Sequence, residues 1–332
     1  MFVNQTSSLK WLSIVVAFMM ALISLQLSYA EAAQPDDYTT SYYIKTSSTS
    51  DLYTLGYNLG QRDYNKSGTQ TNAVILFFGA QQKNASGVWG ASLWGTFQTN
   101  AQIATLASEF ARGYYVGTSS DTASTTTIIL STNNSGSLIT SEAGQQWANM
   151  VLTARSNASA YSSQSIIIGG NDMEIAWATA AKTKDWISGY DGVQGRAIYY
   201  DTGDAAGCPT SGTYSTSTQC ISGNTWSIDD VHYKAYGAPP AWPLPQIYTT
   251  NGSQAAQWYR ISLYGYDYKS GAVQVKGTLS QYQACQQTNS CGTSTNNTAA
   301  QAYNSLSTLL NGNTHTAQTM PFSTDVKHYP QW

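Results

Sequence analysis

The stretch SQSIIIGGNDMEIAW, residues 163–177, decides the fold because it joins a continuous apolar run to two acidic residues. The run SIIIGG is typical of a strand that is buried on both faces of a parallel sheet. Asp172 and Glu174 follow the run two positions apart, and this spacing places both side chains on one face of a strand, with Met173 on the other. The chain therefore carries two carboxyl groups where a buried strand is expected to end.

Further short apolar runs punctuate the chain on both sides of this stretch. They lie at residues 53–60, 72–79, 125–132, 196–203, 231–237, 244–250 and 273–279. Segments with helical spacing of apolar residues lie between them, at 98–113, 138–160, 176–190 and 252–265. Alternation of strand and helix up to eight strands predicts an α/β fold of the (β/α)8 TIM-type barrel class. A doubly wound open sheet is the alternative, but no glycine-rich phosphate-binding turn follows the first run.

The expected barrel covers residues 52–285 and is irregular between its fifth and seventh strands. Residues 203–230 are loop-like there, and GAPPAWP at 237–243 contains too much proline for a helix. The other expected parts of the chain are a signal peptide at 1–30, a Ser/Thr-rich leader at 31–51 and a C-terminal extension at 286–332.

The N-terminus and the cysteines both indicate a secreted, extracellular protein. An apolar stretch at 11–27 follows Lys10 and ends in small residues that suit a signal peptidase. An uncleaved membrane anchor is the alternative; after cleavage we expect no membrane association. Short loops favour the disulfides Cys208–Cys220 and Cys285–Cys291, although other pairings and a zinc site remain alternatives. The zinc alternative is weaker because no C-x-x-C pair is present.

Composition narrows the partners of the protein. Charged residues make up only 10% of the chain, the formal net charge is −3, and no Lys/Arg cluster is present, so nucleic acid is not expected as a partner. The chain contains 10 Trp and 24 Tyr, and aromatic rings stack well on the apolar faces of sugars. We therefore expect a polysaccharide or peptidoglycan substrate, with Trp177 in a loop that could contact it.

Asp172 and Glu174, on one face of a strand, should lie roughly 5 to 7 Å apart. Two carboxyl groups at this distance do not ionise independently when water is partly excluded, so one of them should keep its proton near neutral pH. Glycoside hydrolysis needs this division, with an acid at the leaving oxygen and a second group near the anomeric carbon. Structural roles are the alternative: Asp172 could cap the next helix, or Glu174 could pair with Arg155 or Arg196.

Other polar residues fall at predicted strand ends and complete the candidate site. They are Asn58, Asp201, Gln246 and Tyr248, which could contact substrate or orient water, and which could equally serve as ordinary loop hydrogen-bonding residues. We expect neither a cofactor nor a metal ion at this site.

The triplet Asp172-Met173-Glu174 at the end of a fourth strand resembles the D-x-E motif of family 25 glycoside hydrolases, the lysozyme-type muramidases, and more distantly that of family 18 chitinases. Together with DWISGYDG at 185–192, DTGDAAGCP at 201–209 and LPQIY at 244–248, it also resembles a group of secreted bacterial proteins of unassigned function with a glycoside-hydrolase-like barrel. The family 25 resemblance implies that Glu174 is the general acid and that Asp172 assists it.

Family 25 also carries an aspartate at the end of the first strand, where Gly56-Tyr57-Asn58 places an amide in this chain. The sequence thus favours a secreted glycoside hydrolase acting on a peptidoglycan-like or chitin-like glycan. Because an amide cannot act as an anion, a non-catalytic glycan-binding or cell-surface barrel is the alternative.

Overall fold

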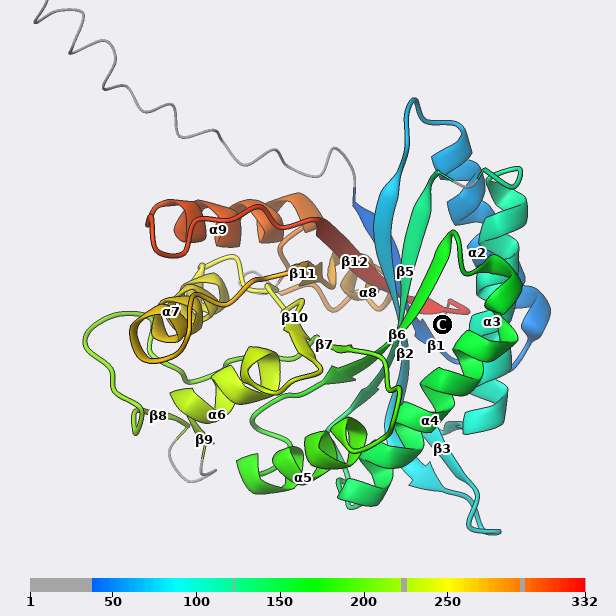
Figure 1. Ribbon diagram of the computed structural model, residues 1–332. Helices are drawn as coiled ribbons and strands as arrows, with labels where there is room; N and C mark the ends of the chain where they lie inside the picture. The colour runs from blue at the N-terminus through cyan, green and yellow to red at the C-terminus, as the bar shows by residue number, and fades with distance from the viewer. Residues whose placement is uncertain (1–37, 122, 222–225, 293–295, 332) are drawn as a thin grey trace, which may run out of the picture. The chain divides into compact units, whose positions relative to one another are not determined.

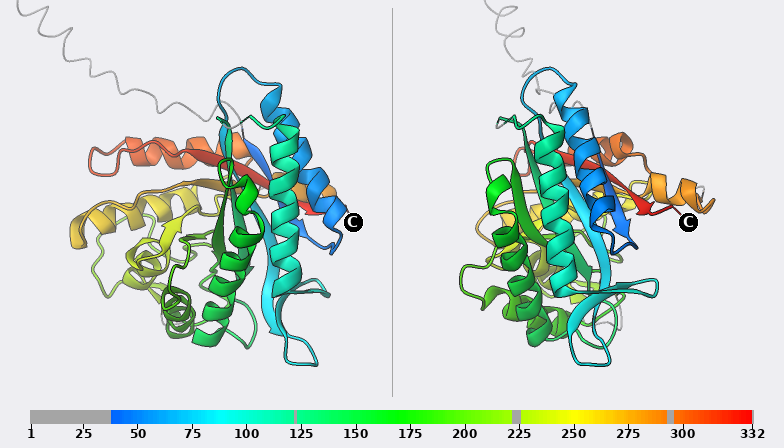
Figure 2. Two further views of the ribbon diagram at one scale, coloured as in Figure 1. Left: turned by 45° about the vertical axis from the view of Figure 1, so that its right-hand side comes forward. Right: turned by 90° about the vertical axis from the view of Figure 1, so that its right-hand side faces the viewer.

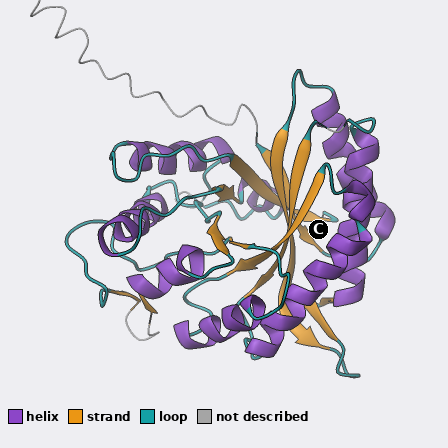
Figure 3. Cartoon of the chain, in the orientation of Figure 1, coloured by secondary structure: helices purple, strands orange, loops and turns teal. Residues whose placement is uncertain are grey.

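Eight parallel strands form a nearly closed barrel with helices on its outside, as Figures 1 and 3 show. The computed structural model describes residues 38–121, 123–221, 226–292 and 296–331. In barrel order the strands are β1 (Thr39–Ile44), β2 (Thr71–Lys83), β5 (Thr125–Asn133), β6 (Ser165–Asp172), β7 (Tyr199–Asp201), β10 (Ala241–Pro243), β11 (Gly277–Ser280) and β12 (Phe322–Tyr329). The predicted (β/α)8 TIM-type barrel is therefore confirmed.

Helical segments alternate with these strands along the chain. They are α2 (Thr49–Tyr64), α3 (Asn100–Gly117), α4 (Ser141–Asn157), a 3-10 turn (Ser159–Tyr161), α5 (Ala180–Asp191), α6 (Ile228–His232), a π-helical turn (Tyr233–Gly237), α7 (Ser253–Tyr268), α8 (Tyr282–Gln287) and α9 (Ala299–Asn311). The helical spacing in the sequence located α3, α4, α5 and α7 because each has one apolar stripe that packs on the strands.

Two different contacts close the barrel. β12 lies parallel to β1 over the whole length of β1, from Thr39 opposite Thr324 to Ile44 opposite Tyr329. The contact with β11 on the other side is narrower and is made by the segment that follows β10: the Ile247 amide donates to the Leu279 carbonyl at 2.9 Å, and the Leu279 amide donates to the Pro245 carbonyl at 2.9 Å. The barrel is therefore least regular between β10 and β11, which are its sixth and seventh strands, within the region where irregularity is predicted.

The apolar run at 53–60 lies in α2 and is not a strand, which corrects the prediction. Its glycines allow α2 and α3 to approach at backbone distance. A Cβ on Gly56 would lie 2.0 Å from the Phe110 carbonyl oxygen, and one on Gly117 would lie 2.3 Å from the Tyr57 carbonyl oxygen. Gly56 and Gly60, four residues apart on α2, therefore allow close packing against α3 and do not mark the end of a strand.

The run at 231–237 is also helical, in α6 and the following π turn. Ser227 caps α6 in a capping box with Asp230, and this local signal outweighs the apolar run. The true first and last strands lie outside the range expected for the barrel, β1 in the predicted leader and β12 in the predicted C-terminal extension. The predicted signal peptide lies outside the described residues.

The long connection from β7 to α6 contains a two-stranded ribbon, β8 (Gln219–Ile221) with β9 (Trp226–Ser227). The disulfide Cys208–Cys220 closes this connection, and Cys285–Cys291 closes the loop after α8, so both predicted pairings are confirmed. In the described ranges, no helix combines the length and apolar character that a membrane span requires.

A hairpin extends the barrel wall at the carboxyl end of β2. β2 pairs with β3 (Trp89–Leu93), which pairs with β4 (Thr96–Thr99), and the hairpin projects from the barrel in Figure 2. At its turn Trp94 adopts a left-handed backbone with φ of 48°, followed by Gly95 with φ of 86°. A non-glycine residue rarely adopts this conformation, so the turn holds Trp94 in a specific orientation.

Candidate active site

A cavity of about 440 Å³ opens at the carboxyl ends of the barrel strands, where TIM-barrel enzymes carry their active sites. Its lining includes five of the seven residues that the sequence predicted for a site: Asp172, Glu174, Trp177, Gln246 and Tyr248. The other lining residues are Tyr43, Phe77, Gly79, Leu93, Trp94, Thr132, Asn133, Ser135 and Gln281.

Gln246 joins the two acids through one amide group. Its Nε2 donates to Oδ1 of Asp172 at 2.6 Å and lies 3.2 Å from Oε1 of Glu174. Asp172 is the last residue of β6 and Glu174 follows two positions later, so both carboxyl groups face the cavity as strand alternation predicts. The buried Met173 side chain packs in the main core instead.

Buried side chains hold the backbone beneath the acids. The side chain of Asn134, from the loop after β5, accepts from the Glu174 amide at 3.0 Å and donates to the Glu174 carbonyl at 3.0 Å. A carboxylate oxygen of Asp204 accepts from the amide of Ile175 at 3.1 Å. These contacts position the acidic loop before any substrate arrives, as a reactive site requires.

Asp201 lies at the end of β7 as expected, but its side chain is sealed inside the barrel and does not line the cavity. It forms an ion pair of 2.7 Å with Nζ of Lys234, and the two side chains are 0% and 1% exposed. Lys234 also donates to the Met173 carbonyl at 2.8 Å. A Cβ on Gly203 would lie 2.3 Å from that same carbonyl oxygen, so a side chain there would displace the acidic loop.

The electrostatics of the two acids follow from their burial. Burial raises the pKa of Asp172 well above its ordinary value, and the charge of Glu174 raises it further. Burial also raises the pKa of Glu174 to about 7, although the hydrogen bond from Gln246 opposes the shift. With a pKa of about 7, Glu174 can hold a proton near neutral pH, which is a condition for acid catalysis.

Aromatic rings form one wall of the cavity. Trp94 is 51% exposed, and its ring centroid lies 5.2 Å from that of Tyr43 and 5.0 Å from that of His328. Trp177, 41% exposed, lines the same cavity from the loop after β6. The sequence prediction does not include Tyr43, because the strand that contains it falls in the predicted leader. The alternating pattern of TTSYYI is the signal that could have identified this strand.

The structural roles considered for the two acids are not seen. Thr179 caps α5, and Arg196 pairs with Asp191. Within the described part of the chain, neither Asp172 nor Glu174 takes part in a salt bridge. The two acids therefore face the cavity without a cation.

Asn58 does not belong to the site, and its predicted place at a strand end is wrong. It lies exposed on α2, because the run that contains it is helical. The first strand of the barrel is β1, which ends in Tyr43 and Ile44, and Tyr43 lines the cavity. An aromatic residue, not an amide, therefore stands near the position where family 25 carries its aspartate.

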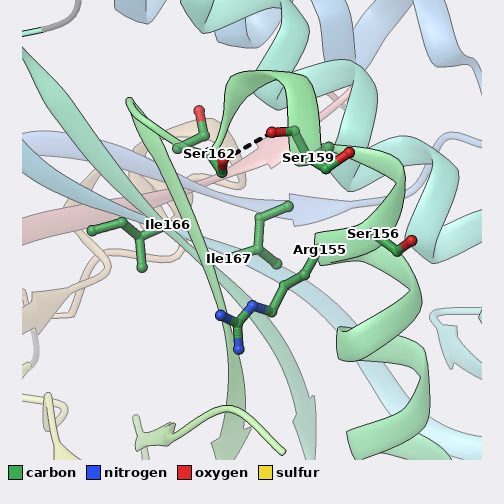
Figure 4. Close-up of a pocket in the computed structure, with 8 residues that line it drawn as sticks. Arg155, Ser156, Ser159, Ser162, Ile166 and Ile167 are labelled. Atoms are coloured by element: carbon green, nitrogen blue, oxygen red, sulfur yellow. Dashed lines mark hydrogen bonds between the residues drawn. The ribbon is translucent and has the colours of Figure 1, made fainter. Parts of the chain in front are cut away.

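A second cavity, of about 360 Å³, lies at the amino end of β6 (Figure 4). Arg155 is the one titratable group in its lining, and the other lining residues are Ser156, Ala158, Ser159, Ser162, Ser165, Ile166 and Ile167. Ser162 donates back to the Ser159 carbonyl at 2.8 Å. With no acid–base pair and at the stability end of the barrel, this cavity is not a candidate for catalysis.

Comparisons with known proteins gave no match. No protein-family model, no curated protein and no solved structure is similar enough to this chain to match it. Among the described residues, no cluster of three or more His, Cys, Asp or Glu side chains is arranged to hold a metal ion. The likeness to family 25 therefore depends on the D-x-E motif alone.

Proposed function

We propose that this protein is a secreted glycoside hydrolase that cleaves a peptidoglycan-like or chitin-like glycan. Glu174 donates a proton to the leaving glycosidic oxygen, and Asp172 orients a water molecule or the acetamido group of the substrate. Gln246 keeps the two carboxyl groups facing the same bond, and Tyr248 and Trp177 contact the sugar from the cavity wall.

One observation carries the proposal: two carboxyl groups share a single neutral donor in an open cavity at the reactive end of a barrel. The pKa of Glu174, raised by burial to about 7, allows it to hold a proton and release it near neutral pH. The pinned backbone of the acidic loop supports the same role, since it removes the need to order the acids during the reaction.

Secretion is part of the proposal. Two disulfides in a chain of this size are typical of an oxidising compartment. The apolar segment at 11–27 supplies a signal sequence in this interpretation.

A second candidate is a non-catalytic glycan-binding barrel, and the charge of the cavity favours it. Asp172 and Glu174 are the acids in its described lining, and the pKa of each is raised. The raised pKa values weaken the negative charge of the pair, whereas a cationic sugar centre is stabilised by a carboxylate. The end of β1 supplies no further acid, because Tyr43 stands there.

Hydrolysis by Glu174→Gln and wild-type protein separates the two candidates. With N-acetylglucosamine oligomers and peptidoglycan as substrates, we expect the variant to release reducing ends at least roughly 100-fold more slowly, because an amide donates no proton. Wild-type activity should decline as pH rises above about 7, where Glu174 loses its proton.

Glu109→Gln is the matched control, because Glu109 pairs with Arg112 on the surface of α3 at 2.6 Å and is remote from the cavity. It should retain wild-type activity. Equal release by wild type and Glu174→Gln, including none from either, would remove the hydrolase and leave the binding barrel.

A further inference from the structure

The charge of the cavity lining restricts which sugars can enter. The described lining contains two acids and no Lys or Arg. Lys234 is buried behind the acidic loop, where it pairs with Asp201 and donates to the Met173 carbonyl. No lining side chain is therefore available to neutralise a negatively charged substrate group.

The histidine beneath Trp94 does not supply a positive charge either. Burial lowers the pKa of His328 below its ordinary value, and the charge of Lys45 lowers it further, so the ring is neutral at neutral pH. It packs between Tyr43 and Trp94, with ring centroids at 5.3 and 5.0 Å. The wall at this side of the cavity is therefore aromatic and uncharged.

The backbone and two neighbouring rings fix the position of Trp94 in that wall. Its left-handed backbone at φ of 48° turns the chain sharply at the end of the hairpin, and two rings support its indole. Half of its surface is nevertheless exposed. An exposed, supported indole beside neutral hydroxyl and amide groups, here Thr132, Asn133 and Gln281, suits a hydroxyl-rich ring with an apolar face.

We infer that the cavity selects an uncharged sugar chain, with one ring stacked on Trp94, and rejects sugars that carry carboxylates. A carboxylate entering the cavity would lose water in a partly enclosed space whose described lining offers no cation in exchange, and any negative charge on the Asp172–Glu174 pair would add repulsion. This inference rests on the proposed function, and it separates the two glycans named there. Chitin-like chains are neutral, whereas the N-acetylmuramic acid of a peptidoglycan-like chain carries a lactyl carboxylate wherever no peptide is attached to it.

Three hexasaccharides with one backbone test the inference. They are the N-acetylglucosamine hexamer, the alternating N-acetylglucosamine–N-acetylmuramic acid hexamer, and the methyl ester of the latter. Binding to wild-type protein is measured by calorimetry at 4 °C, and release of reducing ends is followed in parallel. We expect the acidic hexamer to bind at least tenfold more weakly than the neutral hexamer, and the methyl ester to recover most of the difference.

Two sets of variants locate the effect. Trp94→Ala should weaken binding of the neutral hexamer at least tenfold, while Tyr64→Ala, which removes a ring that is 58% exposed on α2, should change nothing. Gln281→Lys adds a cation at the cavity and should improve binding of the acidic hexamer at least fivefold. Its matched control, Gln281→Met, should not.

The results decide the inference separately from the hydrolase. The inference is overturned if the acidic and neutral hexamers bind equally or if neither binds. It is also overturned if the methyl ester binds as weakly as the acidic hexamer, because the carboxylate charge would then not be the cause. If the neutral hexamer binds through Trp94 and is not cleaved, the result supports the inference and contradicts the proposed hydrolase activity.

Discussion

The neighbouring strands β6 and β7 both end in aspartate, and the two carboxyl groups lie in opposite environments. Asp201, on β7, is sealed from solvent and paired with Lys234 at 2.7 Å. Asp172, on β6, has no cation in the described structure; it shares the neutral amide of Gln246 with Glu174 and faces a cavity.

The two environments have opposite effects on the stability of the barrel. A buried acid that is paired with a cation and hydrogen-bonded holds its surroundings in place. Acids that are buried beside each other without a cation reduce stability when ionised, and such a cost is usually tolerated at a functional site. The pair at β7 supports the acids at β6 through the Met173 carbonyl.

Breaking the paired side should have the largest effect. Lys234→Met leaves Asp201 buried without its cation, and we expect a loss of about 3 to 5 kcal/mol in the free energy of unfolding, measured with urea at pH 7. Lys83→Met is the control, since Lys83 pairs with Glu142 at the surface, and it should cost less than about 1 kcal/mol. Similar losses in both variants would contradict the contrast.

Removing a charge from the unpaired side should stabilise the protein, but only at high pH. Glu174 has an ordinary pKa of 4.5 and a folded-state pKa of about 7, so its contribution to folding is complete below pH 4.5 and lost as pH rises through 7. Glu174→Gln should therefore be more stable than wild type by roughly 1 to 3 kcal/mol at pH 8 and equal to it near pH 4. A difference that is independent of pH would show that the Glu174 carboxyl is not perturbed.

The shared amide should set the pKa of the acids. Gln246 donates to the charged forms, so Gln246→Leu should raise the pKa of Glu174 by about one unit. The titration is followed by carbon NMR of glutamate carboxyl groups, which needs no activity. Gln70→Leu is the control, because the partly buried Gln70 side chain hydrogen-bonds to the Ser67 carbonyl, and it should leave the titration unchanged. A downward shift in Gln246→Leu would contradict the proposed hydrogen bonding.

The smallest effect is expected at Asn58. Because Asn58 is exposed on α2, Asn58→Asp should change the free energy of unfolding by less than about 0.5 kcal/mol and leave glycan binding and cleavage unchanged. Assays at pH 7 with the neutral hexamer check this. Enhanced cleavage in the variant would place Asn58 in the site after all.

The strand periodicity and the acidic spacing were readable from the sequence. Continuous apolar runs located β2, β5 and β6 because these strands are buried on both faces, and the two-residue spacing put Asp172 and Glu174 on one face. Apolar runs gave a wrong prediction at 53–60. This segment is a helix whose glycines pack closely against α3, and the glycines made the run look like a short strand that ends in a turn. Apolar runs also missed β1 and β12, whose polar residues are buried by neighbouring strands: Ser41 and Thr324 hydrogen-bond to each other at 2.7 Å.

The partners of the acids could not be predicted because they come from distant parts of the chain. Lys234 reaches Asp201 across 33 positions, and Asn134 reaches Glu174 across 40. The lysine lies in an aromatic segment that resembles a strand, and nothing in that segment indicates that the side chain turns inward. Tertiary contacts of this kind have no local sequence signal.

The adjacency of β1 and β12 has a consequence for the order of events in synthesis. Tyr43 comes from the first strand and His328 from the last, and both support Trp94. In a nascent chain the support of Trp94 therefore cannot form until β12 has left the ribosome. If the chain crosses a membrane unfolded, the support of Trp94 forms only after β12 has crossed, because β1 and β12 must first pair.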